Sequence, residues 1–201
     1  GRAAATAPLD GRPPALLLAR LPIGLRRREA NGTAQAWRAA RETRDRPVAL
    51  VLTRQNVPTL DRTLFAAADG LRRGAYVLAD APKGKPDLIL IATGPEVGLI
   101  VAAAQKLLAQ GIQARIVSMP SWELFDAEPR AYRDAVLTPS IAPRLAVEAG
   151  ASQGWHRYVR DHGDVLSVDR FGASAPGDVM LREYGFTVEN VCKRAVATLR
   201  R

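Results

Sequence analysis

The sequence is poor in cysteine and in long apolar runs, and each shortage excludes a class of protein. Cys192 is the only cysteine among 201 residues, which excludes a disulfide framework and a cysteine metal cluster. No uninterrupted apolar run approaches the roughly 18 residues that a membrane-spanning helix needs. We therefore expect no membrane partner and a reducing, cytoplasmic location.

Acidic residues and aromatics are scarce in the first 28 residues, whereas arginine is plentiful. This segment holds six arginines and one acidic residue, Asp10, and so carries five of the nine net positive charges. It has no Phe, Tyr or Trp, and a nucleic-acid binder would interleave such rings with its basic side chains. We therefore expect no nucleic-acid partner. Four prolines interrupt residues 1–29 without a lasting period, which predicts an irregular, disordered arm.

Histidine is also scarce, and no catalytic signature surrounds either copy. His156 and His162 do not have the HExxH spacing of a zinc site, and the chain has no GxSxG nucleophile elbow. A pairing of either histidine with a nearby aspartate is conceivable, but packing or partner contact is the better interpretation. The sequence thus predicts no catalytic residue and no metal ligand.

Apolar runs alternate with helical segments from residue 75 onward, which is the order of a parallel sheet. We expect strands at 75–78, 87–92, 114–119, 144–148 and 165–169, and helices at 96–110, after Ser121, at 130–136, around Trp155, at 177–184 and at 188–199. These elements predict an α/β fold, a three-layer sandwich with a mostly parallel sheet of about five strands, over residues 75–201. Ahead of them we expect a helix at 33–43 and a doubly buried strand at 47–53, followed by a connector over residues 59–74.

Four turns that lead into predicted helices carry polar or small residues that a ligand or a helix end could use. Thr93-Gly94-Pro95-Glu96 has the spacing of a capping box, which we favour over an anion cradle because both phosphate-loop patterns are missing. Ser121 and Thr187 are expected to cap the helices that follow them. The small-residue turn 170–177 permits close approach of a ligand or of another subunit, and the sequence leaves both open.

Arg54 is the best candidate for a binding residue. It directly follows the predicted strand 47–53, and ligands of parallel sheets gather at the carboxyl ends of strands. Its guanidinium offers a planar fork suited to phosphate oxygens. Taken alone, the residue is somewhat better interpreted as a solvated or ion-paired loop arginine.

Several of these stretches, taken together, resemble transketolase in their order and spacing from about Ala30 to the C-terminus. The stretches are Thr53-Arg54-Gln55-Asn56, Ser118-Met119-Pro120-Ser121-Trp122-Glu123-Leu124-Phe125, Glu148-Ala149-Gly150 with Trp155-His156, Asp169-Arg170-Phe171-Gly172-Ala173-Ser174-Ala175-Pro176 and Gly185-Phe186-Thr187-Val188-Glu189-Asn190. The resemblance implies that residues 30–74 end the pyrimidine-binding domain and that residues 75–201 form the C-terminal domain.

The resemblance also implies a reaction, cofactors and one site residue. Transketolases transfer a two-carbon ketol unit between sugar phosphates, in the pentose phosphate pathway, with thiamine diphosphate and Mg²⁺. Arg54 matches the family arginine that grips the sugar phosphate. Gly163-Asp164-Val165 and Gly177-Asp178-Val179 both depart from the family's GDG metal motif at the third position. We therefore expect no cofactor or metal on this chain alone, and no activity without a partner.

Residues 1–28 do not match the family sequence expected before Ala30, which suggests an out-of-frame reading upstream. The alternative function is a non-catalytic dimerisation or partner-binding module, either in a homodimer or as the C-terminal subunit of a split transketolase. A formaldehyde-using relative, dihydroxyacetone synthase, also stays open, because the residues that select the substrate are not in this sequence.

Overall fold

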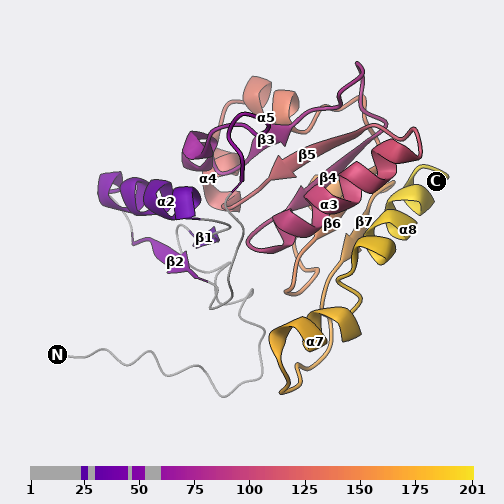
Figure 1. Ribbon diagram of the computed structural model, residues 1–201. Helices are drawn as coiled ribbons and strands as arrows, with labels where there is room; N and C mark the ends of the chain where they lie inside the picture. The colour runs from indigo at the N-terminus through magenta and orange to yellow at the C-terminus, as the bar shows by residue number, and fades with distance from the viewer. Residues whose placement is uncertain (1–23, 27–29, 45–46, 53–59) are drawn as a thin grey trace.

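The structure of the protein, a computed structural model, describes residues 24–26, 30–44, 47–52 and 60–201 (Figure 1). Most of the described chain forms one α/β unit around a five-stranded sheet. Its strands are β3 (Tyr76–Ala79), β4 (Leu88–Ala92), β5 (Ala114–Ser118), β6 (Arg144–Val147) and β7 (Asp164–Leu166). They lie in the order β3-β5-β4-β6-β7, and only β3 is antiparallel to its neighbour. The predicted fold class is confirmed.

β4 explains why the sheet needs cover on both faces. Leu88, Leu90 and Ala92 belong to one hydrophobic cluster, whereas Ile89 and Ile91 belong to the other. Side chains of a strand alternate between faces, so a continuous apolar run fills two cores at once.

Helices cover the two faces of the sheet in separate sets (Figure 1). On one face lie α3 (Glu96–Ala109) and α8 (Val188–Thr198), with Ile100 and Val191 fully buried in the cluster. On the other lie α4 (Trp122–Ala127), α5 (Arg130–Val136) and α6 (His156–Val159). α7 (Gly177–Glu183) stands away from the sheet and has no fully buried residue. No helix in the described part of the chain is long and apolar enough to cross a bilayer.

The N-terminal elements form a small separate layer. They are β1 (Gly24–Arg26), α2 (Ala30–Glu42), β2 (Ala49–Val51) and the 3₁₀ helix η1 (Ala68–Arg73). β1 pairs with β2 in parallel. Residues 24–26 therefore form a strand, whereas an irregular arm was predicted over residues 1–29. β2 is shorter than the predicted strand 47–53 and only half-buried, because β1 is its only strand neighbour within the described residues.

Two of the three predicted helix caps are confirmed and one is wrong. The Ser121 hydroxyl accepts from the Leu124 amide at 3.4 Å, and the Thr187 hydroxyl accepts from the Asn190 amide at 3.2 Å. Thr93 does not cap α3, whose N-cap residue is Pro95, without a side-chain bond. The buried Thr93 hydroxyl instead donates to Glu148, because a carboxylate at the end of β6 lies within 2.7 Å of it.

Candidate functional site

The residues predicted from sequence to be functional are not brought together by the described structure. Arg54 lies in the segment 53–59, outside the described residues, so its role stays a prediction. His156 and His162 are both exposed. Within the part of the chain that the structure describes, neither imidazole forms a hydrogen bond or an ion pair, although the charge of His156 is a minor cause of the lowered pKa of Asp169.

The carboxyl edge of the sheet does collect polar side chains. The Thr93–Glu148 bond joins the ends of the neighbouring strands β4 and β6. Asp169 accepts from the Ser152 amide and from the Ser167 hydroxyl, both at 2.8 Å, and these bonds hold its pKa below the usual carboxyl value. These hydrogen bonds hold the loops at the carboxyl edge of the sheet in place.

The small-residue turn after β7 is held at one end and exposed along its length. The Arg170 guanidinium lies 4.5 Å from the centre of the Tyr184 ring, and the Tyr184 hydroxyl donates to the Phe171 carbonyl at 3.0 Å. Phe171 itself is 86% exposed. The turn therefore presents an aromatic side chain to a potential partner rather than to the core.

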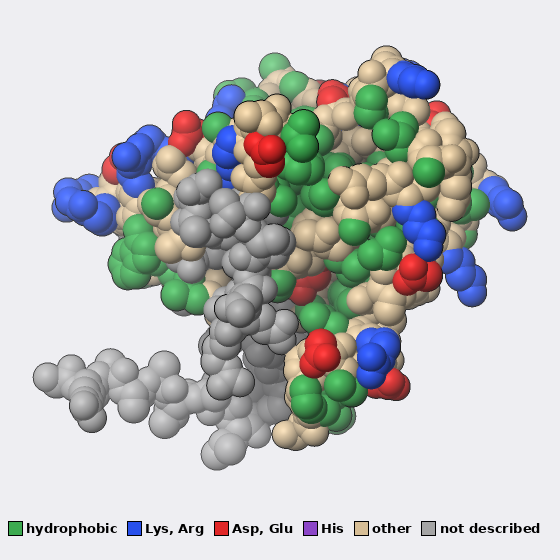
Figure 2. Space-filling view, in the orientation of Figure 1, with side chains coloured by type: hydrophobic (Ala, Val, Ile, Leu, Met, Phe, Trp, Pro, Cys, Tyr) green, Lys and Arg blue, Asp and Glu red, His purple; other side chains and the backbone are tan. Residues whose placement is uncertain are grey.

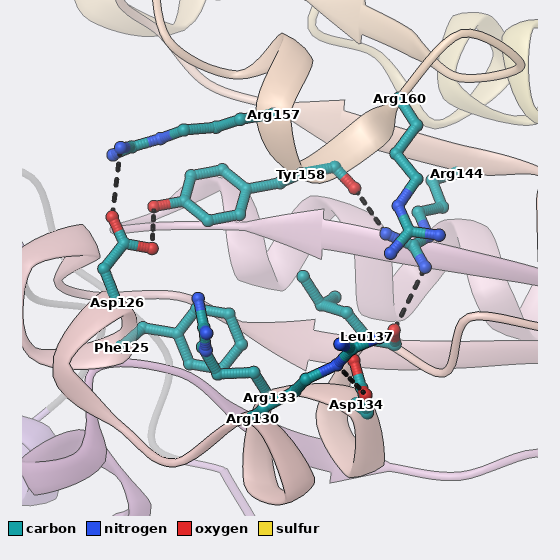
Figure 3. Close-up of a pocket in the computed structure, with 10 residues that line it drawn as sticks. All are labelled: Phe125, Asp126, Arg130, Arg133, Asp134, Leu137, Arg144, Arg157, Tyr158 and Arg160. Carbon is teal, nitrogen blue, oxygen red and sulfur yellow. Dashed lines mark hydrogen bonds and ion pairs between the residues drawn. The ribbon is translucent and has the colours of Figure 1, made fainter.

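A pocket rich in arginine opens on the face of the sheet covered by α4, α5 and α6 (Figure 3). Its volume is about 570 Å³, and its wall includes the aromatic rings of Phe125 and Tyr158. Two aspartates, Asp126 and Asp134, also line it. The five arginines of the wall are Arg130, Arg133, Arg144, Arg157 and Arg160. These residues come from the consecutive elements α4, α5, β6 and α6 and from the turns that follow α5 and α6, and no short sequence motif predicts the pocket.

Arg144, the first residue of β6, is the buried member of this group at 1% exposure. Its guanidinium donates to four carbonyl oxygens, those of Ile141, Tyr158, Leu137 and Thr138, at 2.6 to 3.2 Å. Burial, followed by the nearby positive charge of Arg160, lowers the pKa of Arg144 to about 10, while the charge of Asp134 opposes them. The position read as an ordinary strand start in the sequence.

Both aspartates of the pocket are already engaged (Figure 3). Asp126 lies 3.0 Å from the Arg157 guanidinium and accepts from the Tyr158 hydroxyl at 3.0 Å. Burial, followed by the charge of Asp126, raises the pKa of Tyr158, so this phenol stays protonated as a donor. Asp134 pairs with Arg130 at 3.3 Å.

Arg133 and Arg160 lack such partners. Within the described residues neither guanidinium has a hydrogen bond or an ion pair, and the Nε atom of Arg133 is buried without an acceptor. Arg160 ends α6 with φ 60° and ψ −167°, and it is the only non-glycine residue of the described chain with positive φ.

The described residues do not offer a metal site of their own. No three His, Cys, Asp or Glu side chains in the described ranges lie close enough together to hold a metal ion. Mg²⁺ takes oxygen ligands in near-octahedral geometry, so this part of the chain does not by itself fit the metal of a thiamine diphosphate enzyme.

Comparison with known proteins places the fold and the sequence in one family. A model described as the transketolase-like TK C-terminal domain matches residues 74–187. A transketolase from Geobacillus stearothermophilus is 55% identical over 175 residues, which are 87% of this chain and 26% of the relative.

Solved structures agree. The transketolase of Leishmania mexicana superposes with a TM-score of 0.83 at 36% identity, over 92% of this chain and 27% of that one. A Pichia stipitis transketolase in complex with sedoheptulose 7-phosphate superposes with a TM-score of 0.79 at 35% identity, over 88% of this chain and 25% of that one. The chain thus spans about a quarter of the length of the relatives it matches. It belongs to the transketolase-like TK C-terminal domain family.

Proposed function

We propose that this chain is the C-terminal part of a transketolase, which transfers a two-carbon ketol unit between sugar phosphates. The observation that carries the proposal is the 55% identity to a transketolase over 87% of the chain. In such an enzyme thiamine diphosphate, held with Mg²⁺, stabilises the carbanion of the ketol unit. This chain contributes the rigid α/β scaffold behind that chemistry.

Arg54 is proposed as the group of this chain that binds the substrate. It follows β2 (Ala49–Val51) in sequence, and its guanidinium suits the sugar phosphate. The complex of a Pichia stipitis transketolase with sedoheptulose 7-phosphate supports a phosphorylated sugar as the substrate class. The proposal assigns Arg54 no role in proton transfer.

A chimera tests both statements. Residues 30–201 replace the matching last quarter of the Geobacillus stearothermophilus transketolase, and turnover of xylulose 5-phosphate with ribose 5-phosphate is measured. We expect activity from the chimera. In its Arg54→Ala variant we expect KM for the sugar phosphates to rise roughly tenfold to a hundredfold, from loss of a charge-assisted hydrogen bond of about 1.5–3 kcal/mol. A folded, dimeric chimera without turnover contradicts the proposal, and an unchanged KM contradicts the role of Arg54.

The second candidate is a partner-binding module, either in a homodimer or beside a separately encoded N-terminal subunit. Two exposed aromatic side chains favour it, Phe171 at the turn after β7 and Trp37 on α2. Large aromatic rings are enriched where proteins associate. Sedimentation of the 201-residue chain, alone and with an N-terminal transketolase chain, tests this. Association weakened by Phe171→Ser or Trp37→Ser supports the module, and a monomer that ignores the partner contradicts it.

A further inference from the structure

We propose that the arginine pocket on the α4–α6 face binds a small organic phosphate, through Arg133, Arg160 and Arg144. The proposal is made independently of the substrate contact proposed at Arg54. The proposal does not depend on the ketol-transfer reaction, because every residue that carries it lies in the described C-terminal unit.

The charge of the pocket wall is the first argument. Five arginines face two aspartates, and both aspartates are engaged, Asp126 by Arg157 and Tyr158, Asp134 by Arg130. The three remaining guanidiniums form no ion pair or hydrogen bond with a carboxylate of the described residues, and of these three only Arg144 feels the charge of Asp134. Figure 3 shows the Arg160 guanidinium beside that of Arg144, and like charges at close range are unfavourable unless an anion lies between or near them.

Unused hydrogen-bond donors are the second argument. The buried Nε of Arg133 has no acceptor, and leaving such a donor unsatisfied costs about 1–3 kcal/mol. Arg144 uses one Nη1 proton on the Tyr158 carbonyl, so the other Nη1 proton has no acceptor in the described structure. An oxygen-rich anion in the pocket would offer acceptors to guanidiniums that lack them.

The backbone of Arg160 is the third argument. Its φ of 60° with ψ of −167° lies in a region that only glycine enters readily. Helices often end in a residue with positive φ, but that residue is usually glycine. Here a long cationic side chain stands at the strained position and lines the pocket. Strain of this kind, about 1–3 kcal/mol, persists where a side chain must be held at a particular place.

Shape and geometry select the class of ligand. Guanidinium groups are planar forks that bond phosphate oxygens in pairs. A cavity of about 570 Å³ lies within the range of volumes that small-molecule sites occupy, and this one is open to solvent. The rings of Phe125 and Tyr158 add an apolar wall for the organic part of the ligand. On the different face shown in Figure 2, the Lys and Arg side chains of the described residues stand at separate points, without the continuous stripe that a nucleic-acid backbone would follow.

Titration calorimetry of the 201-residue chain with inorganic pyrophosphate as probe tests the proposal, at fixed ionic strength. We expect saturable one-to-one binding by the natural chain and at least a tenfold loss of affinity in Arg133→Ala. Arg182→Ala, which removes an exposed arginine of α7 outside the pocket, should bind as the natural chain does. Sodium sulfate serves as the competing anion. If sulfate binds as tightly as pyrophosphate at equal concentration, the preference for phosphate is overturned.

Arg160→Gly separates binding from folding. Glycine accepts φ 60° without strain, so this variant should melt at the same temperature as the natural chain or higher. Its affinity for pyrophosphate should nevertheless fall at least tenfold, because the guanidinium is gone. The proposal is overturned if the natural chain fails to bind millimolar pyrophosphate. It is also overturned if the Arg160→Gly chain binds pyrophosphate as tightly as the natural chain.

Discussion

Arg144 lies at the base of the pocket with its guanidinium bonded to backbone carbonyl oxygens on two sides. Leu137, Thr138 and Ile141 come from the segment after α5, and Tyr158 comes from α6. The side chain therefore ties two connecting segments to the start of β6. The charged side chain of Arg144 therefore mainly stabilises the fold, and one Nη1 proton has no acceptor in the described structure.

Removing this side chain should be costly. Arg144→Met is expected to lower the free energy of unfolding by about 3–5 kcal/mol, because buried carbonyl oxygens lose their only charged donor. Arg130→Met is the matched control, since the Arg130 side chain is 87% exposed and its ion pair with Asp134 is screened by water. We expect the control to change stability by less than about 0.5 kcal/mol. Urea unfolding measures both, and equal losses would refute the structural role.

The ion pair between Asp164 and Arg194 should also stabilise the fold. Arg194 donates to both oxygens of Asp164, at 2.7 Å and 3.0 Å. Burial alone would raise the pKa of Asp164, but the bonds from Arg194 outweigh it and hold the pKa below the usual 3.8. The pair joins the start of β7 to α8.

This pair should make stability depend on pH in a defined direction. A carboxyl with a lowered folded-state pKa stabilises the fold fully above its unfolded-state pKa, near 3.8, and the contribution disappears as pH falls through the lower folded value. Asp164→Asn should therefore cost about 1 kcal/mol at pH 7, after allowance for solvent screening. The difference from the natural chain should shrink below pH 4. Denaturation at pH 7, 5 and 3 checks this, and a difference that grows toward acid would show that the sign is wrong.

At the scale of elements, apolar patterning was enough to predict the sheet. The run Leu88–Ala92 is apolar at every position, which indicated a strand, and the structure places this strand between β5 and β6. The predicted cap at Thr93 failed because a local sequence pattern does not reveal contacts with distant residues. The Thr93 hydroxyl bonds to Glu148, 55 residues away in sequence, instead of to the start of α3 beside it. The arginine pocket could not be predicted, since its residues meet only after α4, α5 and α6 pack on the sheet.

The contact between η1 and α4 depends on a glycine. Gly74 has φ 77°, and a Cβ there would lie 2.2 Å from the Phe125 amide nitrogen and 2.4 Å from the Ser121 carbonyl oxygen. These are backbone atoms at the start of α4, so the helix itself would have to move. The carbonyl of Gly74 also accepts from the Ser121 amide at 2.9 Å.

Gly74→Ala is therefore expected to destabilise the chain more than the same change at Gly84. Gly84 has the same φ of 77° but no atom within 4 Å of a built Cβ, so Gly84→Ala isolates the backbone strain. We expect about 1 kcal/mol of strain at Gly84 and at least about 2 kcal/mol more at Gly74. Thermal melting of both variants gives the comparison. Similar melting temperatures would mean that α4 is not packed against Gly74 as described.

At the scale of the whole molecule, the chain corresponds to a quarter of each relative but to a complete hydrophobic unit. Two clusters of buried side chains enclose the sheet from both sides, and they are built from residues 75–201 alone, apart from partly buried contacts. A sheet covered on both faces can fold without the rest of a transketolase. Within the described ranges, no three His, Cys, Asp or Glu side chains lie close enough together to hold a metal ion.

The most direct test is to give the 201-residue chain everything that the reaction needs except further protein. Thiamine diphosphate and Mg²⁺ are titrated into the purified chain by calorimetry, and ketol transfer from xylulose 5-phosphate to ribose 5-phosphate is assayed in the same samples. The account predicts no transfer above background and no thiamine-specific binding, meaning none beyond what pyrophosphate alone shows at the arginine pocket. Tight binding of the coenzyme that requires its thiazolium and pyrimidine rings, together with turnover, would contradict it.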